Sequence, residues 1–234
     1  NILIAGTNGK GSTGAMVSSI LSEAGYRVGF YSSPHLVSFR ERIRIGKELI
    51  SKSEVVSLAE SLAHSLKWDL SNLSQPPPAT VTYFEFVTAM ALLYFVQKGV
   101  DLAVMEVGMG GRLDATNITS PLLSVITMID YDHTEYLGKT LAEIASEKAG
   151  IIRESGLAIV SRQKSEARDI ILKICQKIRA NVYISPLNFH GKCVSYEPSG
   201  QLFDFWSPDL ILKELPLNLP GRFQIENAST AIQT

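Results

Sequence analysis

Seven residues near the start of the chain have the types and the spacing of a loop that binds phosphate. They are Gly6–Ser12, with the sequence GTNGKGS, and they follow a short apolar run, Ile2–Ala5, and open a predicted helix. In that context backbone N–H groups and the positive end of the helix face an anion, and glycines let the anion approach closely. The side chain of Lys10 then reaches the terminal phosphates. The segment predicts nucleoside triphosphate binding, against the alternative of a glycine-rich turn with an exposed lysine.

The loop departs from the strict GxxxxGK[ST] pattern of P-loop proteins at two positions. Ile4 stands where the first glycine of the pattern would be, and Gly11 follows Lys10 in place of serine or threonine. A hydroxyl group arrives one residue later, at Ser12. The strand, the glycines, the lysine and the helix keep the required order, so the phosphate-binding interpretation stands.

Polar residues follow three of the predicted strands, at the ends where ligands collect in open α/β sheets. They are Ser32, Ser33 and His35 after the second strand, Glu106 at the end of the third, and Asp130, Asp132 and His133 after the fourth. Mg²⁺ prefers hard oxygen ligands and combines one or two protein groups with phosphate oxygens. A carboxylate that closes an apolar run, as Glu106 does, is costly unless it is paired or bound to a cation. The alternatives are hydrogen bonds from the N–H groups of Gly108–Gly111 for Glu106, and an ordinary core or surface histidine for His133.

A glycine-rich loop with both signs of charge follows Glu106. It is Val107–Asn117, with the sequence VGMGGRLDATN, and its glycines favour neither a strand nor a helix. Such a loop is able to hold a substrate against the phosphates, although a solvated turn has the same composition. Lys148 lies at the end of another predicted helix, where the helix dipole favours a cation. Its plain interpretation is a C-terminal lysine or a partner of Glu147.

The elements that must position these residues alternate between short apolar or β-branched runs and longer helical patterns. This alternation predicts an α/β fold with a mainly parallel sheet and helices on both faces. The predicted strands are Ile2–Ala5, Val28–Tyr31, Leu102–Glu106, Leu123–Met128, Leu157–Ser161 and Val182–Ile184. The predicted helices are Ser12–Ala24, Ser53–Lys67, Thr82–Gln97, Leu141–Gly150 and Ser165–Arg179. Short strands and turns between residues 190 and 215 predict a small antiparallel edge.

The composition limits the classes of function. The chain has 22 Lys and Arg against 23 Asp and Glu, a net charge of −1, and 45% hydrophobic residues. It is an ordinary globular chain without the basic surface that nucleic acid requires. The longest apolar run, Phe84–Val96, is shorter than the roughly 20 residues that cross a bilayer. Two cysteines, Cys175 and Cys193, cannot make a disulfide framework, so a reducing compartment, the cytoplasm, is expected.

Three segments lie outside this regular pattern. Asn1 opens the chain inside an apolar run, and the helical pattern Ile225–Thr234 stops without a cap, so we expect a protein truncated at both ends. Ser71–Ala79, which contains three consecutive prolines, is predicted to form a stiff surface loop. The rest reads as one domain, residues 1–234.

Seven segments, in order along the whole chain, together resemble the folylpolyglutamate synthase/dihydrofolate synthase family, the folate branch of the Mur-type ligases. They are GTNGKGS at 6–12, SSPHL at 32–36 with ERI at 41–43, TYFE at 82–85, EVGMGGRLDATN at 106–117, DHTEYLG at 132–138, EKAGI at 147–151 and GRFQIEN at 221–227. Several of these segments are individually weak, whereas their combination is specific. The resemblance implies the fold of the central, ATP-binding domain of a Mur ligase.

The resemblance also implies roles for individual residues. ATP is bound by Asn8, Gly9, Lys10, Gly11, Ser12 and Asn227. Mg²⁺, as two ions, is bound by Ser33, Glu106 and His133. The pterin substrate is bound by Thr82, Tyr83, Phe84, Glu85, Leu113, Asp114 and Ala115. Catalytic roles fall on Lys10, His133 and Lys148, and Lys148 matches a lysine that can be carbamylated in this family, which turns its amine into an anion able to sit beside magnesium.

The activity that the resemblance implies is ATP-dependent ligation of L-glutamate to the carboxylate of folate or dihydropteroate, through an acyl phosphate, with ADP and phosphate as products. The implied partners are ATP, the pterin acceptor and L-glutamate, with no nucleic acid and no membrane, and a monomer is expected at full length. A C-terminal domain that helps to bind glutamate in relatives is not expected within residues 1–234.

Three alternatives to this activity stay open. The first is a cell-wall Mur ligase that acts on a nucleotide-sugar carboxylate, although TYFE and GGRLDATN weigh against it. The second is a P-loop module that binds ATP without ligase activity, and the constellation beyond the loop weighs against that. The third is a chain that folds and binds ATP but catalyses nothing, because part of the glutamate site lies elsewhere.

Overall fold

The computed structural model describes residues 1–69 and 81–234. Its strands are β1 (Ile2–Ala5), β2 (Val28–Tyr31), β3 (Ile43–Ile45), β4 (Glu48–Leu49), β5 (Leu102–Glu106), β6 (Leu123–Ile126), β7 (Leu157–Val160), β8 (Asn181–Ile184), β9 (His190–Glu197), β10 (Gly200–Trp206) and β11 (Ile211–Leu217). Its α-helices are α1 (Lys10–Glu23), α2 (Lys52–Ser65), α3 (Tyr83–Gln97), α4 (Thr134–Leu137), α5 (Leu141–Ala149), α6 (Ser165–Lys177) and α7 (Phe223–Gln233), and two short 3-10 helices are η1 (Phe39–Arg42) and η2 (Ala115–Ile118). The loop predicted at Ser71–Ala79 lies outside the described residues.

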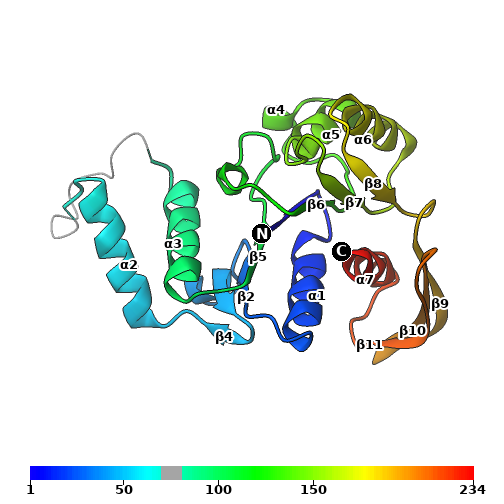
Figure 1. Ribbon diagram of the computed structural model, residues 1–234, viewed down its shortest axis with the longest axis horizontal. Helices are drawn as coiled ribbons and strands as arrows, with labels where there is room; N and C mark the ends of the chain where they lie inside the picture. The colour runs from blue at the N-terminus through cyan, green and yellow to red at the C-terminus, as the bar shows by residue number, and fades with distance from the viewer. Residues whose placement is uncertain (70–80) are drawn as a thin grey trace.

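Strand β1 lies inside an eight-stranded sheet whose order is β4-β3-β2-β5-β1-β6-β7-β8 (Figure 1). From β2 to β8 in that order neighbouring strands run parallel, and β3 and β4 continue the sheet in the antiparallel sense. The carboxyl ends of parallel strands meet at one edge, so the residues that follow β1, β5 and β6 come together there. The predicted α/β fold with a mainly parallel sheet is confirmed.

Both faces of the sheet are covered by helices. Leu3 and Ala5 of β1 belong to a core that includes buried residues of α3, α5 and α6, whereas Ile2 and Ile4 belong to a core that includes residues of α1 and α7. Successive side chains of a strand point to opposite faces, which explains this division. A parallel sheet buried on both faces needs strands that are apolar throughout, and this is the pattern that the sequence predicted.

Antiparallel strands occur at two places, and the sequence predicted one of them. Strands β9, β10 and β11 form a three-stranded sheet of their own, beside α7 in Figure 1. Phe203 and Phe205 of β10 are buried in the core that contains Ile225 and Ala228 of α7. The strands predicted between residues 190 and 215 are therefore present in a separate sheet, because α7 offers them an apolar face. The antiparallel edge of the main sheet is the pair β3 and β4, whose strands of three and two residues are too short for a clear pattern.

Helix α3 is apolar on most sides, and its burial was predicted. Its middle is buried in the core, from Val87 to Phe95 along one face. The helix starts at a capping box, in which Thr82 Oγ1 accepts from the Glu85 N–H and the Glu85 carboxylate accepts from the Thr82 N–H. Within residues 1–69 and 81–234, no helix combines the length and the apolar composition needed to cross a membrane.

Candidate functional site

The loop Gly6–Ser12 leads from β1 into α1, and its conformation leaves the start of the helix open. The Thr7 and Asn8 N–H groups donate to the Met128 carbonyl oxygen at 2.9 and 3.1 Å, which ties the loop to the chain that leaves β6. Gly9 precedes the first helical residue with φ of 88°, and no side chain caps the helix. An uncapped N-terminus offers free N–H groups and a partial positive charge to an anion.

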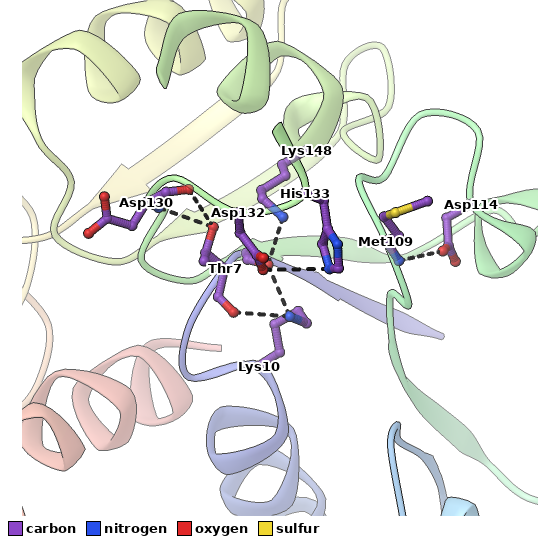
Figure 2. Close-up of polar contacts among 9 residues, drawn as sticks. Thr7, Lys10, Met109, Asp114, Asp130, Asp132, His133 and Lys148 are labelled. Carbon is purple, nitrogen blue, oxygen red and sulfur yellow. Dashed lines mark hydrogen bonds and ion pairs between the residues drawn. The ribbon is translucent and has the colours of Figure 1, made fainter. Parts of the chain in front are cut away.

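Two lysines meet at this loop. The Lys10 ammonium donates to the carbonyl oxygens of Gly6 and Thr7 at 3.1 and 3.2 Å, and the Lys148 ammonium donates to the same Gly6 oxygen at 2.9 Å (Figure 2). Lys148 is buried, with 3% of its surface exposed. Burial, followed by the charge of Lys10, lowers the pKa of Lys148 to about 8. Lys148 lies in the last turn of α5, as the plain interpretation has it, but its side chain reaches the phosphate loop and Glu147 pairs with Arg112 instead.

Glu106 ends β5 beside the same loop, and its carboxylate is buried. Its Oε2 accepts from the Ser33 N–H at 3.2 Å, the one hydrogen bond that it makes within the described residues. Burial raises the pKa of Glu106, and the charges of Lys10 and Arg42 and the Ser33 bond oppose that rise. The alternative partners of Glu106, the N–H groups of Gly108–Gly111, are not confirmed, because two of them donate to Asp114.

His133 follows β6 and precedes α4 in a left-handed conformation with φ of 48°. Its Nε2 lies 3.6 Å from Asp132 Oδ2, and both side chains are about half exposed. Figure 2 shows this pair beside Lys10 and Lys148, and the Asp132 charge acts to raise the pKa of Lys148. His133 thus lies close to the two lysines that bind the phosphate loop.

The donor set at this edge fits magnesium. The described part of the chain holds no group of three or more His, Cys, Asp or Glu side chains arranged for a metal. Mg²⁺ does not require such a group, since it takes one or two protein oxygens and completes its shell with water and phosphate. The Glu106 carboxylate is buried, and the Ser33 N–H donates to it, so the backbone of Ser33 and the carboxylate of Glu106 are in contact. A cation would offset the cost of keeping Glu106 ionised.

A cavity of about 650 Å³ opens beside the loop Val107–Asn117. Every residue that the sequence analysis predicted to bind the pterin lines it, and so does Ser33. Its walls are Ser33, Pro34, Arg42, Thr82, Tyr83, Phe84, Glu85, Gly108, Met109, Gly110, Gly111, Leu113, Asp114, Ala115, Tyr136, Leu137 and Glu147. Tyr83 and Leu113 are 61% and 81% exposed, so the cavity offers apolar surface to a flat ligand.

Asp114 shapes one wall of this cavity. Its Oδ2 accepts from the N–H groups of Gly108 and Met109 at 3.1 and 3.0 Å. Its Oδ1 accepts from the Thr116 N–H at 3.0 Å and from the Thr116 hydroxyl at 2.6 Å. The carboxylate is therefore saturated by its own loop, and the glycine-rich segment is a folded turn. Thr82 and Glu85 are engaged in the same way, since they cap α3.

Two charged residues of the cavity wall received no role in the sequence analysis. Arg42 ends η1, and its Nε donates to His35 Nδ1 at 2.8 Å. Glu147 pairs with Arg112, whose Nη2 lies 3.0 Å from Glu147 Oε1. Arg42 stands in the ERI segment and Glu147 in EKAGI, but no local pattern shows that these segments meet the loop after β5.

A second cavity, of about 470 Å³, lies against the phosphate loop. It is lined by Asn8, Gly9, Met128, Ser161, Arg162, Gln163, Lys164, Phe223, Glu226 and Asn227. Asn227 Oδ1 packs so close to Gly9 that a Cβ there would overlap it, which requires glycine. Gln224 of α7 connects Asn227 to the phosphate loop, since it accepts from Asn227 Nδ2 at 2.9 Å and donates to Ser12 Oγ at 3.4 Å. The predicted nucleotide residue Asn227 thus lies at the phosphate loop.

Comparison with known proteins identifies the family. A family model described as the Mur ligase middle domain matches residues 4–234. The chain belongs to this Mur ligase family. The predicted relationship to the Mur-type ligases is confirmed.

Curated relatives of this Mur ligase domain carry folate names. The dihydrofolate synthase/folylpolyglutamate synthase of Escherichia coli is 48% identical over 98% of the chain and 50% of the relative. The protein of the same name from Bacillus subtilis is 39% identical over 98% of the chain and 53% of the relative. The chain therefore spans about half the length of the curated relatives it matches.

Solved structures agree with this Mur ligase fold. The folylpolyglutamate synthase of Thermotoga maritima matches with a TM-score of 0.89 and 42% identity, over 99% of this chain and 52% of that one. A folylpolyglutamate synthase solved as a complex with AMPPCP and folate matches with a TM-score of 0.92 and 34% identity, over 99% and 56% of the two chains. At these identities the folds correspond along nearly the whole chain.

The Mur ligase domain brings the predicted site residues together in three groups. The predicted nucleotide residues Asn8, Gly9 and Asn227 line the smaller cavity. The predicted pterin residues line the larger cavity. Lys10, Lys148, Glu106 and His133 gather at the phosphate loop between them. Their individual roles remain predictions.

Proposed function

We propose that the protein containing this chain ligates L-glutamate to the carboxylate of a folate or dihydropteroate acceptor, with ATP converted to ADP and phosphate. The observation that carries the proposal is the presence of two separate cavities, each lined by residues predicted to bind one of the two substrates. Three of the predicted nucleotide residues, Asn8, Gly9 and Asn227, line one cavity, and all the predicted pterin residues line the other. The folate names of the curated relatives, and the relative solved with AMPPCP and folate, support the same assignment.

The chemistry needs activation of a carboxylate, because a carboxylate is a poor electrophile. We propose that the acceptor carboxylate, lying where the larger cavity meets the loop, attacks the γ-phosphate of ATP in line. The new acyl-phosphate bond forms as the bond to ADP breaks. The amine of glutamate then attacks the acyl carbon, and phosphate leaves. Lys10 and the open N-terminus of α1 stabilise the charge that spreads over the transferred phosphoryl group.

Ser33, Glu106 and His133 are the residues that we propose to hold magnesium, as two ions. Bound magnesium would neutralise phosphate charge and help to orient the oxygens. The chain's own contribution is a buried carboxylate kept beside the loop by the Ser33 N–H.

Lys148 fits a reactive amine in this proposal. A pKa of about 8 leaves a useful fraction of the amine neutral near physiological pH, and a neutral amine can add CO₂ to give a carbamate and a proton. The carbamate would reverse the charge beside Lys10 and give the site another oxygen ligand for a cation.

The remaining parts of the proposal concern the whole protein. The chain spans about half of its curated relatives, which supports a second domain that completes the glutamate site. We propose residues 1–234 as the ATP-binding catalytic domain of a cytoplasmic protein that acts as a monomer. The free cysteines Cys175 and Cys193 fit a reducing compartment.

The decisive test is a ligation assay on the full-length protein with ATP, Mg²⁺ and labelled glutamate. Dihydropteroate, tetrahydrofolate and a cell-wall nucleotide-sugar acceptor would be compared. We expect label in a pterin product, and phosphate release that depends on both the pterin and glutamate. Label in the nucleotide-sugar product, or phosphate release without any acceptor, would contradict the proposal and favour a cell-wall ligase or a simple ATP-binding module.

A further inference from the structure

In the larger cavity the acidic side chains have partners in the protein, whereas the basic side chain has no ion-pair partner among the described residues. Among its lining residues, the carboxylates are Glu85, Asp114 and Glu147, and the one cation is Arg42. Each carboxylate already has partners in the protein: Glu85 accepts from Thr82, Asp114 accepts four hydrogen bonds from its loop, and Glu147 pairs with Arg112. Within residues 1–69 and 81–234, no Asp or Glu forms an ion pair with Arg42.

Arg42 is held in place by groups that leave most of its donors unused. Its Nε donates to His35 Nδ1 at 2.8 Å, and its guanidinium carbon lies 5.7 Å from the centre of the Tyr83 ring. Its backbone oxygen accepts from the Ser32 N–H at 3.0 Å, which ties it to the end of β2. In the described part of the chain, its two terminal nitrogens have no hydrogen-bond partner. A fixed guanidinium with free terminal N–H groups is suited to bind a carboxylate through two parallel bonds.

Arg42 lies in the wall of the larger cavity, where its charge also lowers the pKa of Glu106, and it is not one of the lysines that bind the phosphate loop. Lys10 and Lys148 meet at the Gly6 carbonyl oxygen and do not line the larger cavity, whereas Arg42 does. The carboxylate that reacts with ATP must lie at the phosphate loop, near those lysines. A ligand in the cavity therefore meets two cationic positions, one at the loop and one at Arg42.

We propose that Arg42 binds a second carboxylate of the acceptor, the one that is not phosphorylated. The inference rests on the proposed function and makes that function more specific. Dihydropteroate has a single carboxylate, which must go to the phosphate loop. A folate has two on its terminal glutamate, so one remains for Arg42. Arg42 is thus a residue that favours acceptors already carrying glutamate, and the larger cavity is built for chain extension as well as for any first addition.

The test compares the two acceptors in full-length wild type, Arg42→Ala and Arg42→Lys. Initial rates of glutamate ligation give KM and kcat for dihydropteroate and tetrahydrofolate, and equilibrium titration gives Kd for an acceptor that binds without turnover. Arg168→Ala is the matched control, because Arg168 lies on α6 and pairs with the neighbouring Asp169. We expect Arg42→Ala to raise KM or Kd for tetrahydrofolate about ten- to a hundredfold, as the loss of a charged hydrogen-bond pair predicts. The value for dihydropteroate should stay within about threefold of wild type.

Other outcomes overturn the inference. An equal rise in KM or Kd for both acceptors would show that Arg42 only maintains the shape of the cavity wall. No rise for either acceptor would show that Arg42 does not bind the acceptor. A wild-type protein that ligates and binds only dihydropteroate would also contradict it while leaving the proposed function intact. A wild-type protein that ligates neither acceptor would instead refute the proposed function itself. If thermal unfolding shows that Arg42→Ala is not folded, Arg42→Lys provides the test. We expect it to weaken the affinity for tetrahydrofolate about three- to tenfold and to leave the affinity for dihydropteroate unchanged.

Discussion

Lys10 and Lys148 donate hydrogen bonds to one carbonyl oxygen, that of Gly6, at 3.1 and 2.9 Å. Lys10 belongs to the phosphate loop, whereas Lys148 comes from the end of α5 on the opposite face of the sheet. Two ammonium groups on one acceptor repel each other, and burial adds to the cost of charging Lys148. An anion at the loop would relieve both costs, so the pair forms a site prepared for negative charge.

The Lys148 ammonium is expected to destabilise the folded protein at neutral pH. Its folded pKa of about 8 lies below its ordinary value of 10.5, so the unfolded chain binds more protons between these values. The penalty is complete below pH 8 and disappears as the pH rises toward 10.5. Lys148→Met removes this penalty but also the hydrogen bond to the Gly6 carbonyl oxygen. The net result should be a rise of about 1–3 kcal/mol in the free energy of unfolding at pH 7 and a smaller rise at pH 9.5. Urea unfolding at both pH values measures this. An equal gain at both would contradict it, and Lys139→Met, at an exposed site, should show no such difference.

Lys10→Ala is expected to abolish ligation and to leave the fold intact. Lys10 is half-buried and bonds to loop carbonyls, so its removal takes away charge stabilisation at the phosphoryl group without opening a core. The expected loss in kcat is about a thousandfold, with a melting temperature within a few degrees of wild type. Incorporation of labelled glutamate measures the first and circular dichroism the second. Lys173→Ala, on the exposed face of α6, is the control, and wild-type turnover in Lys10→Ala would reject the assignment.

Glu106→Gln removes the negative charge of Glu106 and keeps the size of the side chain, so it tests the role of the charge alone. The amide oxygen can still accept from the Ser33 N–H. Because burial raises the pKa of Glu106, the folded state holds its proton to higher pH than the unfolded chain, and the ionised carboxylate costs stability at neutral pH. The variant should therefore unfold no more easily than wild type at pH 7. Its activity should require at least about tenfold more Mg²⁺ for half-maximal rate. An unchanged Mg²⁺ requirement would remove Glu106 from the metal site.

Asp114→Asn tests whether Asp114 builds the cavity wall. An asparagine can accept on one oxygen only, and its NH₂ group would face the Gly108 and Met109 N–H donors. We expect a loss of about 1–3 kcal/mol in the free energy of unfolding and a weaker affinity for the pterin acceptor, with ATP affinity unchanged. Denaturant titration and ligand titration measure the two effects. Asp169→Asn, on the surface of α6, is the control; weaker ATP binding in Asp114→Asn would show damage beyond the wall.

Gly9 and Asn227 should be energetically coupled. A Cβ at position 9 would overlap Asn227 Oδ1, and Gly9 also has φ of 88°, which strains other residues. Gly9→Ala should therefore destabilise the protein, and Asn227→Ala should remove the overlap but not the strain. The double variant is expected to be about 1 kcal/mol more stable than the sum of the single effects predicts. Urea unfolding of the four proteins closes the cycle, and strict additivity would show that the two residues do not meet in solution.

The parts of the site that lie next to one strand were predictable from sequence. Gly6–Ser12 follows β1 directly, and Glu106 is the last residue of β5. Both positions could be predicted because a short apolar run is followed by polar residues in each case. The rule that ligands gather at the carboxyl ends of parallel strands then brought them together. Thr82 and Glu85 also carried a local signal, since T-x-x-E before an apolar run marks a capping box. Thr82 and Glu85, predicted only as substrate-binding residues, thus also start α3.

The contacts between distant segments were not predictable in the same way. Lys148 resembled any lysine at a helix end, because its partner is a backbone oxygen of a loop on another strand. The structural role of Asp114 in its own loop was not predictable, because the backbone N–H groups that it accepts from leave no trace in a sequence. A binding role for Arg42 could be inferred only from the fold, which places it in the wall of the larger cavity beside carboxylates that already have partners. The short β3–β4 hairpin that positions Arg42 had no clear periodicity.

The two cavities share no lining residue, and the turn from Gly6 to Lys10 contributes Asn8 and Gly9 to the smaller cavity only. A single inhibitor designed to fill both would need a linker that passes over this turn. That linker would take the place of the triphosphate, so an anionic or strongly hydrogen-bonding bridge suits it better than an alkyl chain. Joining the two halves would raise their effective concentration at the site, and selectivity could then be tuned from the pterin half alone.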